Sequence, residues 1–277
     1  MAKITAAEVN KLRKQTGAGM MDCKKALVEA EGDFEKAVEV LRKQGQKVAA
    51  KRADRENTEG AVIAVVSDDK TKGALISLNC ETDFVAKNDG FVKLAYEFAN
   101  LALASSAANL EEFLASDFGG MSVSEKLVEQ TGVIGEKVEV KSYEKLEAPL
   151  VGSYIHAGNK IAAMTALSAN VEGADVAAKD VSMQAAAMNP VALNEEGVDQ
   201  TIIDKEIEIA KDQLRQEGKP EAMLDNIAKG KIKKFFKENT LVNQAFIKDN
   251  KATVSSYVKS VNSDLEVTAF VRVGLGV

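Results

Sequence analysis

The chain repeats one order of patterns, strand, turn, strand and helix, and this repetition restricts its fold more than any other feature. In the first copy, strand patterns occupy 61–66 and 73–80, with the turn Asp68-Asp69-Lys70 between them. A helix pattern over 89–104 follows, with apolar residues three and four positions apart. Two strands this close in sequence predict a hairpin followed by a helix.

The second copy begins after a proline that interrupts the chain. Strand patterns occupy 151–155 and 161–167, and an alanine-rich helix pattern occupies 174–188. Between the copies, 110–131 is expected to be helical and 136–143 to be a strand. The sequence therefore predicts an α+β fold whose core consists of two related strand-strand-helix halves.

The N-terminal segment predicts three short helices. A capping box opens the first helix, Asp22 is the expected N-cap of the second, and the helices are expected to end at Gly17, Gly32 and Gly45. A charged connector follows. Because so few residues form only a marginal core, such a bundle is usually a docking module rather than an enzyme.

A charged segment after residue 198 has apolar residues at heptad-like spacing and predicts a projecting helical hairpin. Its narrow apolar stripe favours self-association as a homodimer or packing against the core, and the sequence does not choose between them. The expected parts are 1–57 for the docking module and connector, 58–148 for the first half of the core, 149–198 with 230–277 for the second half, and 199–229 for the inserted hairpin.

The composition argues against several classes of protein. No signal segment or bilayer-spanning run is present, so a cytoplasmic protein without membrane contact is expected. The chain has two cysteines, Cys23 and Cys80, which are too few for a disulfide framework, and its single histidine, His156, does not complete a typical zinc site with them. The sequence also lacks a phosphate-binding glycine loop. No metal or cofactor is therefore expected. A Cys-His nucleophile pair stays formally open, but no orienting third group is visible.

The distribution of charged residues leaves nucleic-acid binding open as an alternative function. Residues 1–57 carry 13 Lys and Arg against 9 Asp and Glu, although the whole chain has a net charge of −6. The run 229–237 holds five lysines around two phenylalanines, as a nucleic-acid patch would. A small RNA-binding or ribosome-associated protein is therefore the alternative. The net negative charge of the chain and the lack of an aromatic-rich sheet argue against this alternative. The lysine-rich segment 229–237 is interpreted as a solvated helix face.

Two segments resemble the motifs of the elongation factor Ts family. The first is LRKQTGAGMMDCKKAL over residues 12–27, and the second is LNCETDFVAK over residues 78–87, preceded by Ser77 where the family usually has glutamate. Longer members add a helical C-terminal module after the last strand, so contacts of that module are not expected here. Further similarity lies in Ile134-Gly135-Glu136, Val151-Gly152-Ser153-Tyr154, His156 and Lys233-Lys234-Phe235-Phe236.

The resemblance implies a guanine-nucleotide exchange factor with a UBA-like N-terminal module and no covalent catalysis. Its partner would be elongation factor Tu, in the GDP-bound and nucleotide-free forms, with no direct contact to nucleic acid. Asp83 and Phe84 would press beside the partner's magnesium site, while His156 would contact its distal domain. The complete expected partner-binding set is Arg13, Met20, Met21, Thr82, Asp83, Phe84, Val85, Ile134 and His156.

These residues also have purely structural interpretations. Phe84 alone is more often a core aromatic, and Asp83 is a first-turn residue favoured by the helix dipole. Met20 and Met21 could fill gaps between helices, although flexible thioethers also suit a docking surface. His156 could be a solvated turn residue. The exposure of each side chain separates the two interpretations.

Overall fold

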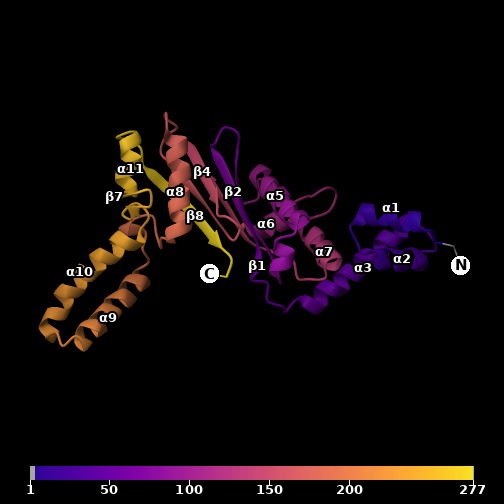
Figure 1. Ribbon diagram of the computed structural model, residues 1–277, viewed down its shortest axis with the longest axis horizontal. Coiled ribbons are helices and arrows are strands. Elements are labelled where there is room, and N and C mark those ends of the chain that lie inside the picture. Colours follow the sequence, from indigo (N-terminus) through magenta and orange to yellow (C-terminus); the bar gives the residue numbers. More distant parts are fainter. Residues whose placement is uncertain (1–3, 277) are drawn as a thin grey trace.

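The fold is α+β, and the molecule is elongated (Figure 1). The computed structural model describes residues 4–276. A helical module lies at the N-terminal end, two sheets with their helices form the middle, and a pair of long helices projects at the opposite end. Within the described span, no helix combines the length and the apolar character that a membrane crossing requires.

Three helices form the N-terminal module. The first begins at a capping box, in which the side chains of Thr5 and Glu8 bind each other's backbone N–H groups, and it ends at Gly17 with a φ of 72°. Leu12 and Leu27 are fully buried between the helices. The helices are α1 (Ala6–Thr16), α2 (Met20–Glu29) and α3 (Phe34–Arg52).

Two boundaries predicted for this module are wrong. Gly19, not Asp22, is the N-cap of α2, so the two methionines that follow Gly19 open the helix. The third helix does not end at Gly45 but continues to Arg52, and most of the expected connector is therefore helical. A glycine near the end of a helical pattern was read as a stop signal, whereas Gly45 serves a contact between helices.

That contact joins α3 to α7 (Val123–Ile134). A Cβ atom added to Gly132 of α7 would lie 2.5 Å from the Cα atom of Gly45. Because glycine has no side chain, the two helix backbones can approach this closely. The glycine pair therefore fixes the N-terminal module against the core.

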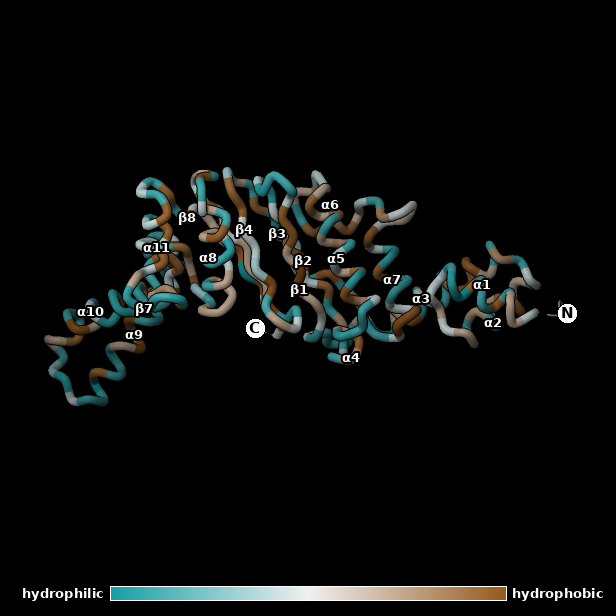
Figure 2. Tube along the Cα trace, turned by 45° about the horizontal axis from the view of Figure 1, so that its top comes forward, coloured by the Kyte–Doolittle hydropathy of each residue, from teal (hydrophilic) through white to brown (hydrophobic). Residues whose placement is uncertain are grey.

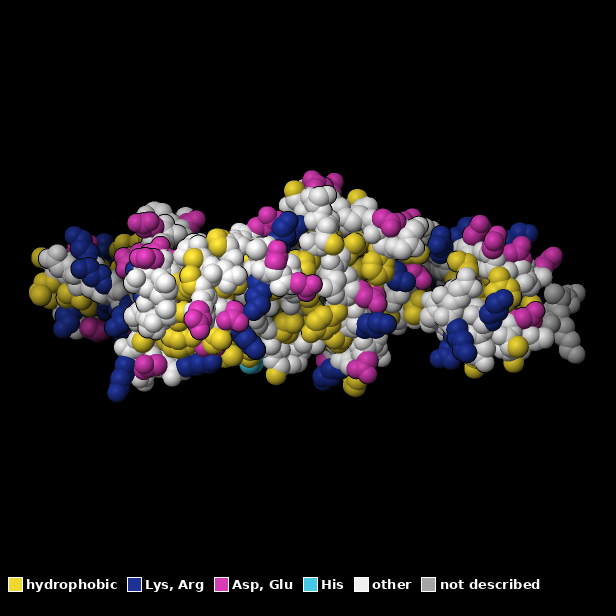
Figure 3. All heavy atoms as spheres, turned by 90° about the horizontal axis from the view of Figure 1, so that it is seen from above, with side chains coloured by type: hydrophobic (Ala, Val, Ile, Leu, Met, Phe, Trp, Pro, Cys, Tyr) yellow, Lys and Arg dark blue, Asp and Glu magenta, His cyan; other side chains and the backbone are white. Residues whose placement is uncertain are grey.

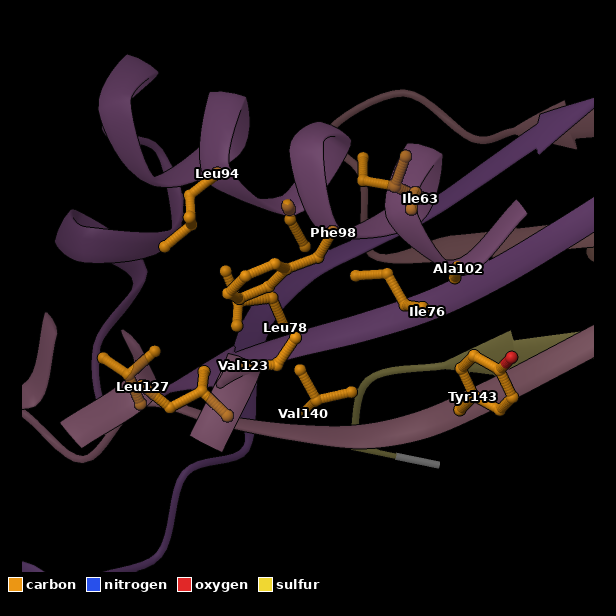
Figure 4. Packing of buried hydrophobic residues seen from close by; sticks show 14 of the residues in the cluster. Ile63, Ile76, Leu78, Leu94, Phe98, Ala102, Val123, Leu127, Val140 and Tyr143 are labelled. Carbon is orange, nitrogen blue, oxygen red and sulfur yellow. The ribbon is translucent and has the colours of Figure 1, made fainter. Parts of the chain in front are cut away.

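The first half of the core is an antiparallel sheet in the order β1-β2-β3, with helices on its outer face. Phe98 points onto the sheet near Leu78 (Figure 4), and its ring meets that of Phe113 edge to face at 6.5 Å between centroids. The helix predicted over 110–131 is interrupted at 116–122, where two glycines adopt positive φ. The elements are β1 (Glu59–Val66), β2 (Lys72–Cys80), β3 (Glu139–Glu147), α5 (Asp89–Ala104), α6 (Leu110–Ala115) and α7.

The second half has the strand order β4-β5-β8 and also carries its helices on the outer face. One helix lies very close to the sheet, since a Cβ atom on Gly152 would stand 2.5 Å from the Cβ atom of Ala178. The last strand pairs with β5, and Thr253 caps the last helix, as predicted. The elements are β4 (Leu150–Ile155), β5 (Ile161–Leu167), α8 (Ala174–Met188), β6 (Ala245–Phe246), β7 (Asp249–Thr253), α11 (Val254–Val261) and β8 (Val267–Gly274).

The inner faces of the two sheets pack against each other. Val62 and Leu75 from the first sheet share one buried cluster with Val151 and Met164 from the second. Strands β1 and β2 are consequently buried on both faces, which explains their nearly continuous apolar runs (brown in Figure 2). The core thus has four layers, helices, sheet, sheet and helices.

The projecting pair consists of α9 (Gln200–Gln216) and α10 (Glu221–Asn239), and a short 3-10 turn, η1 (Glu195–Gly197), precedes it. Leu214 and Leu224 are buried where the two helices meet. Because α10 continues to Asn239, the expected boundary after residue 229 falls inside a helix.

Replacing Gly132 by alanine is expected to destabilise the chain, because the added methyl group must push α3 away from α7. We expect a loss of about 1 to 3 kcal/mol in the free energy of unfolding, measured by urea denaturation. Gly230→Ala in α10 is the control, since a Cβ atom there meets nothing within 4 Å. That variant should be neutral or gain up to about 1 kcal/mol. Equal effects of both changes would contradict the close contact.

Candidate functional site

A one-turn helix, α4 (Asp83–Ala86), forms a corner directly after β2 and lies at one edge of the core (Figure 2). Thr82 is its N-cap and accepts a hydrogen bond of 3.4 Å from the N–H of Val85. Phe84 is 84% exposed, whereas Val85 packs against the first half of the core. We call residues 82–87 the α4 corner. The core interpretation of Phe84 is therefore wrong, because the side chain points into solvent.

Two carboxylates fasten this corner to its surroundings. Glu136 accepts hydrogen bonds from the backbone N–H groups of Glu81 at 3.1 Å and Thr82 at 3.0 Å, and from the hydroxyl of Thr82 at 2.7 Å. The Glu81 carboxylate pairs with Arg52 at 2.8 Å and accepts the N–H of Lys137 at 2.6 Å. An exposed aromatic ring thus stands on a tightly bound backbone.

Asp83 lies in an electropositive environment. Its carboxylate accepts a hydrogen bond of 2.6 Å from Lys87. This hydrogen bond, together with the charges of Lys87 and Lys160, holds the pKa of the Asp83 carboxyl below its usual range. The side chain is therefore an anion at neutral pH.

His156 lies in the turn between β4 and β5 and is exposed. Its Nδ1 atom is 3.1 Å from the hydroxyl oxygen of Tyr154. Lys160, at the end of the same turn, forms an ion pair of 2.9 Å with Glu59, the first residue of β1, and β1 is a strand that α4 contacts. The β4–β5 turn and the α4 corner therefore lie beside each other, on one edge of the stacked sheets.

Of the other expected partner-binding residues, only Ile134 belongs to the core, and Arg13, Met20 and Met21 are not at this edge. Arg13 is in the last turn of α1, and Met20 and Met21 are 55% and 62% exposed at the start of α2, in the module at the far end of the molecule (Figure 1). The two methionines do not fill a gap. Ile134 ends α7 and is partly buried against the first half of the core. The predicted residues thus form one group at the core edge and another on the N-terminal module.

Three residues that support the α4 corner are not among the site residues predicted from the sequence. Glu136 follows α7, Glu81 follows β2 and Arg52 ends α3, and no local pattern indicates that these segments meet. The one available signal was the left-handed Gly135, because a glycine that ends a helix turns the next side chain back towards the fold.

The two thiols are unsuited to chemistry. Cys23 and Cys80 are fully buried, and burial raises the pKa of the Cys80 thiol to about 12. The Sγ atom of Cys80 lies 3.2 Å from the carbonyl oxygen of Thr82 and supports the corner from below. Across residues 4–276, no three His, Cys, Asp or Glu side chains gather as a metal site would require.

Comparison with known proteins gives consistent matches. A family model described as "Elongation factor TS" matches residues 81–277. The chain is 72% identical to elongation factor Ts from Christiangramia forsetii over 276 residues, and the alignment covers all of both chains. It is 66% identical to elongation factor Ts from Flavobacterium psychrophilum, again with full coverage of both chains. The protein of the same name from Chlorobaculum parvum is 43% identical over 287 residues, with all of both chains covered.

Both thiols are expected to be inert in the folded protein, because each is shielded from solvent and a thiol with a raised pKa is rarely a thiolate. Titration with 5,5′-dithiobis(2-nitrobenzoic acid) at pH 8 should label neither cysteine in native buffer and both in guanidinium chloride. The unfolded sample is the control for reagent and protein. Rapid native labelling of Cys80 would contradict its burial and reopen the thiol-enzyme hypothesis.

Proposed function

This chain belongs to the elongation factor Ts family and is a guanine-nucleotide exchange factor for elongation factor Tu, and we propose that the α4 corner is the element that drives GDP release. The observation that carries this proposal is Phe84, a large apolar side chain that is 84% exposed on a hydrogen-bonded corner. Contact between the exposed ring and water is unfavourable in free energy, and a partner surface that covers the ring would remove this contact.

The exchange reaction requires linkage rather than covalent chemistry. A factor that binds the nucleotide-free partner more tightly than the GDP-bound partner must weaken GDP binding by the same factor. Phe84 supplies a wedge, and Asp83 supplies a fixed negative charge beside it. Inserted near the magnesium site of elongation factor Tu, this pair would disturb the coordination of Mg²⁺ and the phosphate contacts. The chain itself has no role as a catalyst in this scheme.

Docking uses surfaces away from the wedge. The N-terminal module, which we propose to be UBA-like, would dock on the nucleotide-binding domain through Arg13, Met20 and Met21. The exposure of both methionines supports this assignment. His156 and the second half of the core would hold the distal domain. The proposed parts 1–57, 58–148 and 149–198 with 230–277 would then have separate tasks, and the hairpin 199–229, whose second boundary falls inside α10, would take no part in this docking.

Thr82, Val85 and Ile134 complete the proposed contact surface. Thr82 caps α4, while Val85 and Ile134 are each partly buried against the same core and partly open. They would form the base from which the wedge projects. Cytoplasmic location follows from this role, because the exchange factor must act where translation takes place.

The RNA-binding alternative is not favoured. The lysines of 229–237 lie along α10, Lys231 binds Gln213 of α9, and Phe235 and Phe236 are partly buried rather than presented. On the face seen in Figure 3, basic and acidic side chains alternate along the molecule without a continuous basic stripe. These features support a solvated helix face.

We further propose that self-association, a possible homodimer, uses the outer face of the α9–α10 pair. The apolar stripe of α9 ends in Ala210 and Leu214, which are buried against α10 and are not available to a second copy. Ile209 and Met223 remain 40% and 51% exposed on the pair. These two side chains are the apolar surface that a second copy would cover.

Phe84→Ala is expected to abolish most of the acceleration of GDP release while leaving stability nearly unchanged. Because the ring is exposed, truncation removes little burial, and the midpoint of thermal unfolding should barely move. Release of a fluorescent GDP analogue from elongation factor Tu measures the first effect, and calorimetry measures the second. Tyr96→Ala is the matched control, since Tyr96 is a partly exposed aromatic on α5. Normal exchange by Phe84→Ala would refute the wedge.

Met223→Glu is expected to convert a dimeric chain into a monomer, because a charge would enter the proposed apolar contact. Sedimentation equilibrium measures the mass. Met188→Glu is the control, since this methionine is similarly exposed, at 48%, but lies at the end of α8. A monomeric parent chain at high concentration would overturn self-association without touching the exchange function.

A further inference from the structure

We propose that Glu136 is a positioning residue for nucleotide exchange, because its carboxylate holds the α4 corner in the orientation that presents Phe84. This inference rests on the proposed function of the corner. Glu136 is not proposed to contact elongation factor Tu. Its role would be to act through Thr82 and the backbone of the corner.

The contacts of Glu136 lie at the switch from strand to helix. One carboxylate oxygen accepts the N–H groups of Glu81 and Thr82 at 3.1 and 3.0 Å, and the other accepts the hydroxyl of Thr82 at 2.7 Å. These N–H groups follow the last residue of β2 and precede α4, so neither element supplies their acceptor. A carboxylate also interacts favourably with the N-terminal end of a helix. Glu136 thus satisfies three donors at once.

The corner needs such an external tie. A helix of four residues has too few internal hydrogen bonds to fix its own direction. Phe84 contributes no packing, because its ring is exposed, and only Val85 and Ala86 contact the core. The direction of the Phe84 side chain therefore depends on the backbone at Thr82, which is the backbone that Glu136 binds.

Glu136 is itself held firmly. Gly135 ends α7 in the left-handed conformation, with a φ of 79°, and its N–H donates to the carbonyl oxygen of Thr131 at 2.9 Å. The next residue, Lys137, donates its N–H to the carboxylate of Glu81 at 2.6 Å. Glu136 accepts the backbone N–H of Glu81, and Lys137 donates its N–H to the side chain of Glu81. Each of the two segments therefore supplies both a backbone donor and a carboxylate acceptor to the other.

The same contacts extend to the docking module. The Arg52 guanidinium contacts both carboxylate oxygens of Glu81 at 2.8 Å, and Arg52 is the last residue of α3. Docking by α1–α3 and insertion of Phe84 are therefore mechanically connected through Glu81. Within this connection, the contacts of Glu136 with Thr82 are the ones that reach α4 itself.

Glu136→Ala should leave both N–H groups and the hydroxyl without their acceptor, so the corner should lose its fixed direction. The experiment measures release of a fluorescent GDP analogue from elongation factor Tu over a range of chain concentrations. We expect the maximal rate to fall at least about tenfold, because small misplacements of a positioned group have large effects. The half-saturating concentration should change less than about threefold, since docking uses other surfaces.

Glu136→Gln tests whether the contacts or mere packing matter. The amide oxygen can still accept the two N–H groups, so this variant should recover most of the maximal rate. Glu97→Ala is the matched control, because Glu97 is an exposed carboxylate of the same half and forms an ion pair with Lys93 at 3.8 Å, on its own helix. Hydrogen–deuterium exchange of peptides covering 81–87 should be faster in Glu136→Ala and unchanged in Glu97→Ala.

Phe84→Ala and the double variant separate the two proposals. If Phe84→Ala is defective and Glu136→Ala adds little to it, Glu136 acts through the wedge, as proposed. If Phe84→Ala is defective but Glu136→Ala exchanges GDP normally, the positioning role is overturned while the wedge survives. If Phe84→Ala exchanges normally, the wedge fails, and hydrogen–deuterium exchange alone then decides for or against the tie at residues 81–87.

Discussion

The packing of the two sheets against each other is the contact on which the rest of the structure depends. It buries the inner faces of β1, β2, β4 and β5, and each large apolar side chain in it contributes about 1.5 to 3 kcal/mol. The packing also aligns the end of β2 with the turn between β4 and β5. As a result, Phe84 of the α4 corner and His156, 72 residues apart in sequence, occupy one edge of the stacked sheets.

Much of the architecture was predictable because its signals are local. The helices over 89–104 and 174–188 are confirmed at both ends, since apolar spacing and caps act over a few residues. Apolar runs locate β1, β2, β4 and β5 to within about two residues. The strand predicted over 136–143 lies instead at Glu139–Glu147, and the short strands β6 and β7 have no predicted counterpart. The errors arose where a residue has two possible physical roles. The sequence pattern predicts a helix end at Gly45, although this glycine permits a close helix crossing, and it predicts an unbroken helix where the structure has a glycine-containing break at 116–122.

The candidate site also combines features with local sequence signals and features that depend on distant contacts. The motif containing Phe84 was identified from sequence, but only the structure shows that its ring is exposed, because a lone aromatic in a short helix fits both interpretations. The support of the corner has only one sequence signal, the helix-ending Gly135, and that glycine does not identify which residues Glu136 binds. Glu136 acts on residues 54 and 55 positions earlier in the chain, and Arg52 acts on a residue 29 positions later. Contacts of that range depend on the completed fold.

One helix spans the distance between the two groups of proposed contact residues. With 19 residues, α3 is about 28 Å long at 1.5 Å per residue, and it is fixed near its middle by Gly132 and at its end by Glu81. If both groups contact the partner as proposed, such a spacer makes the molecule a bivalent ligand with a fixed distance between its two patches. Once one patch is engaged, the other is held at a high effective concentration, so each patch can be weak and release can begin at either.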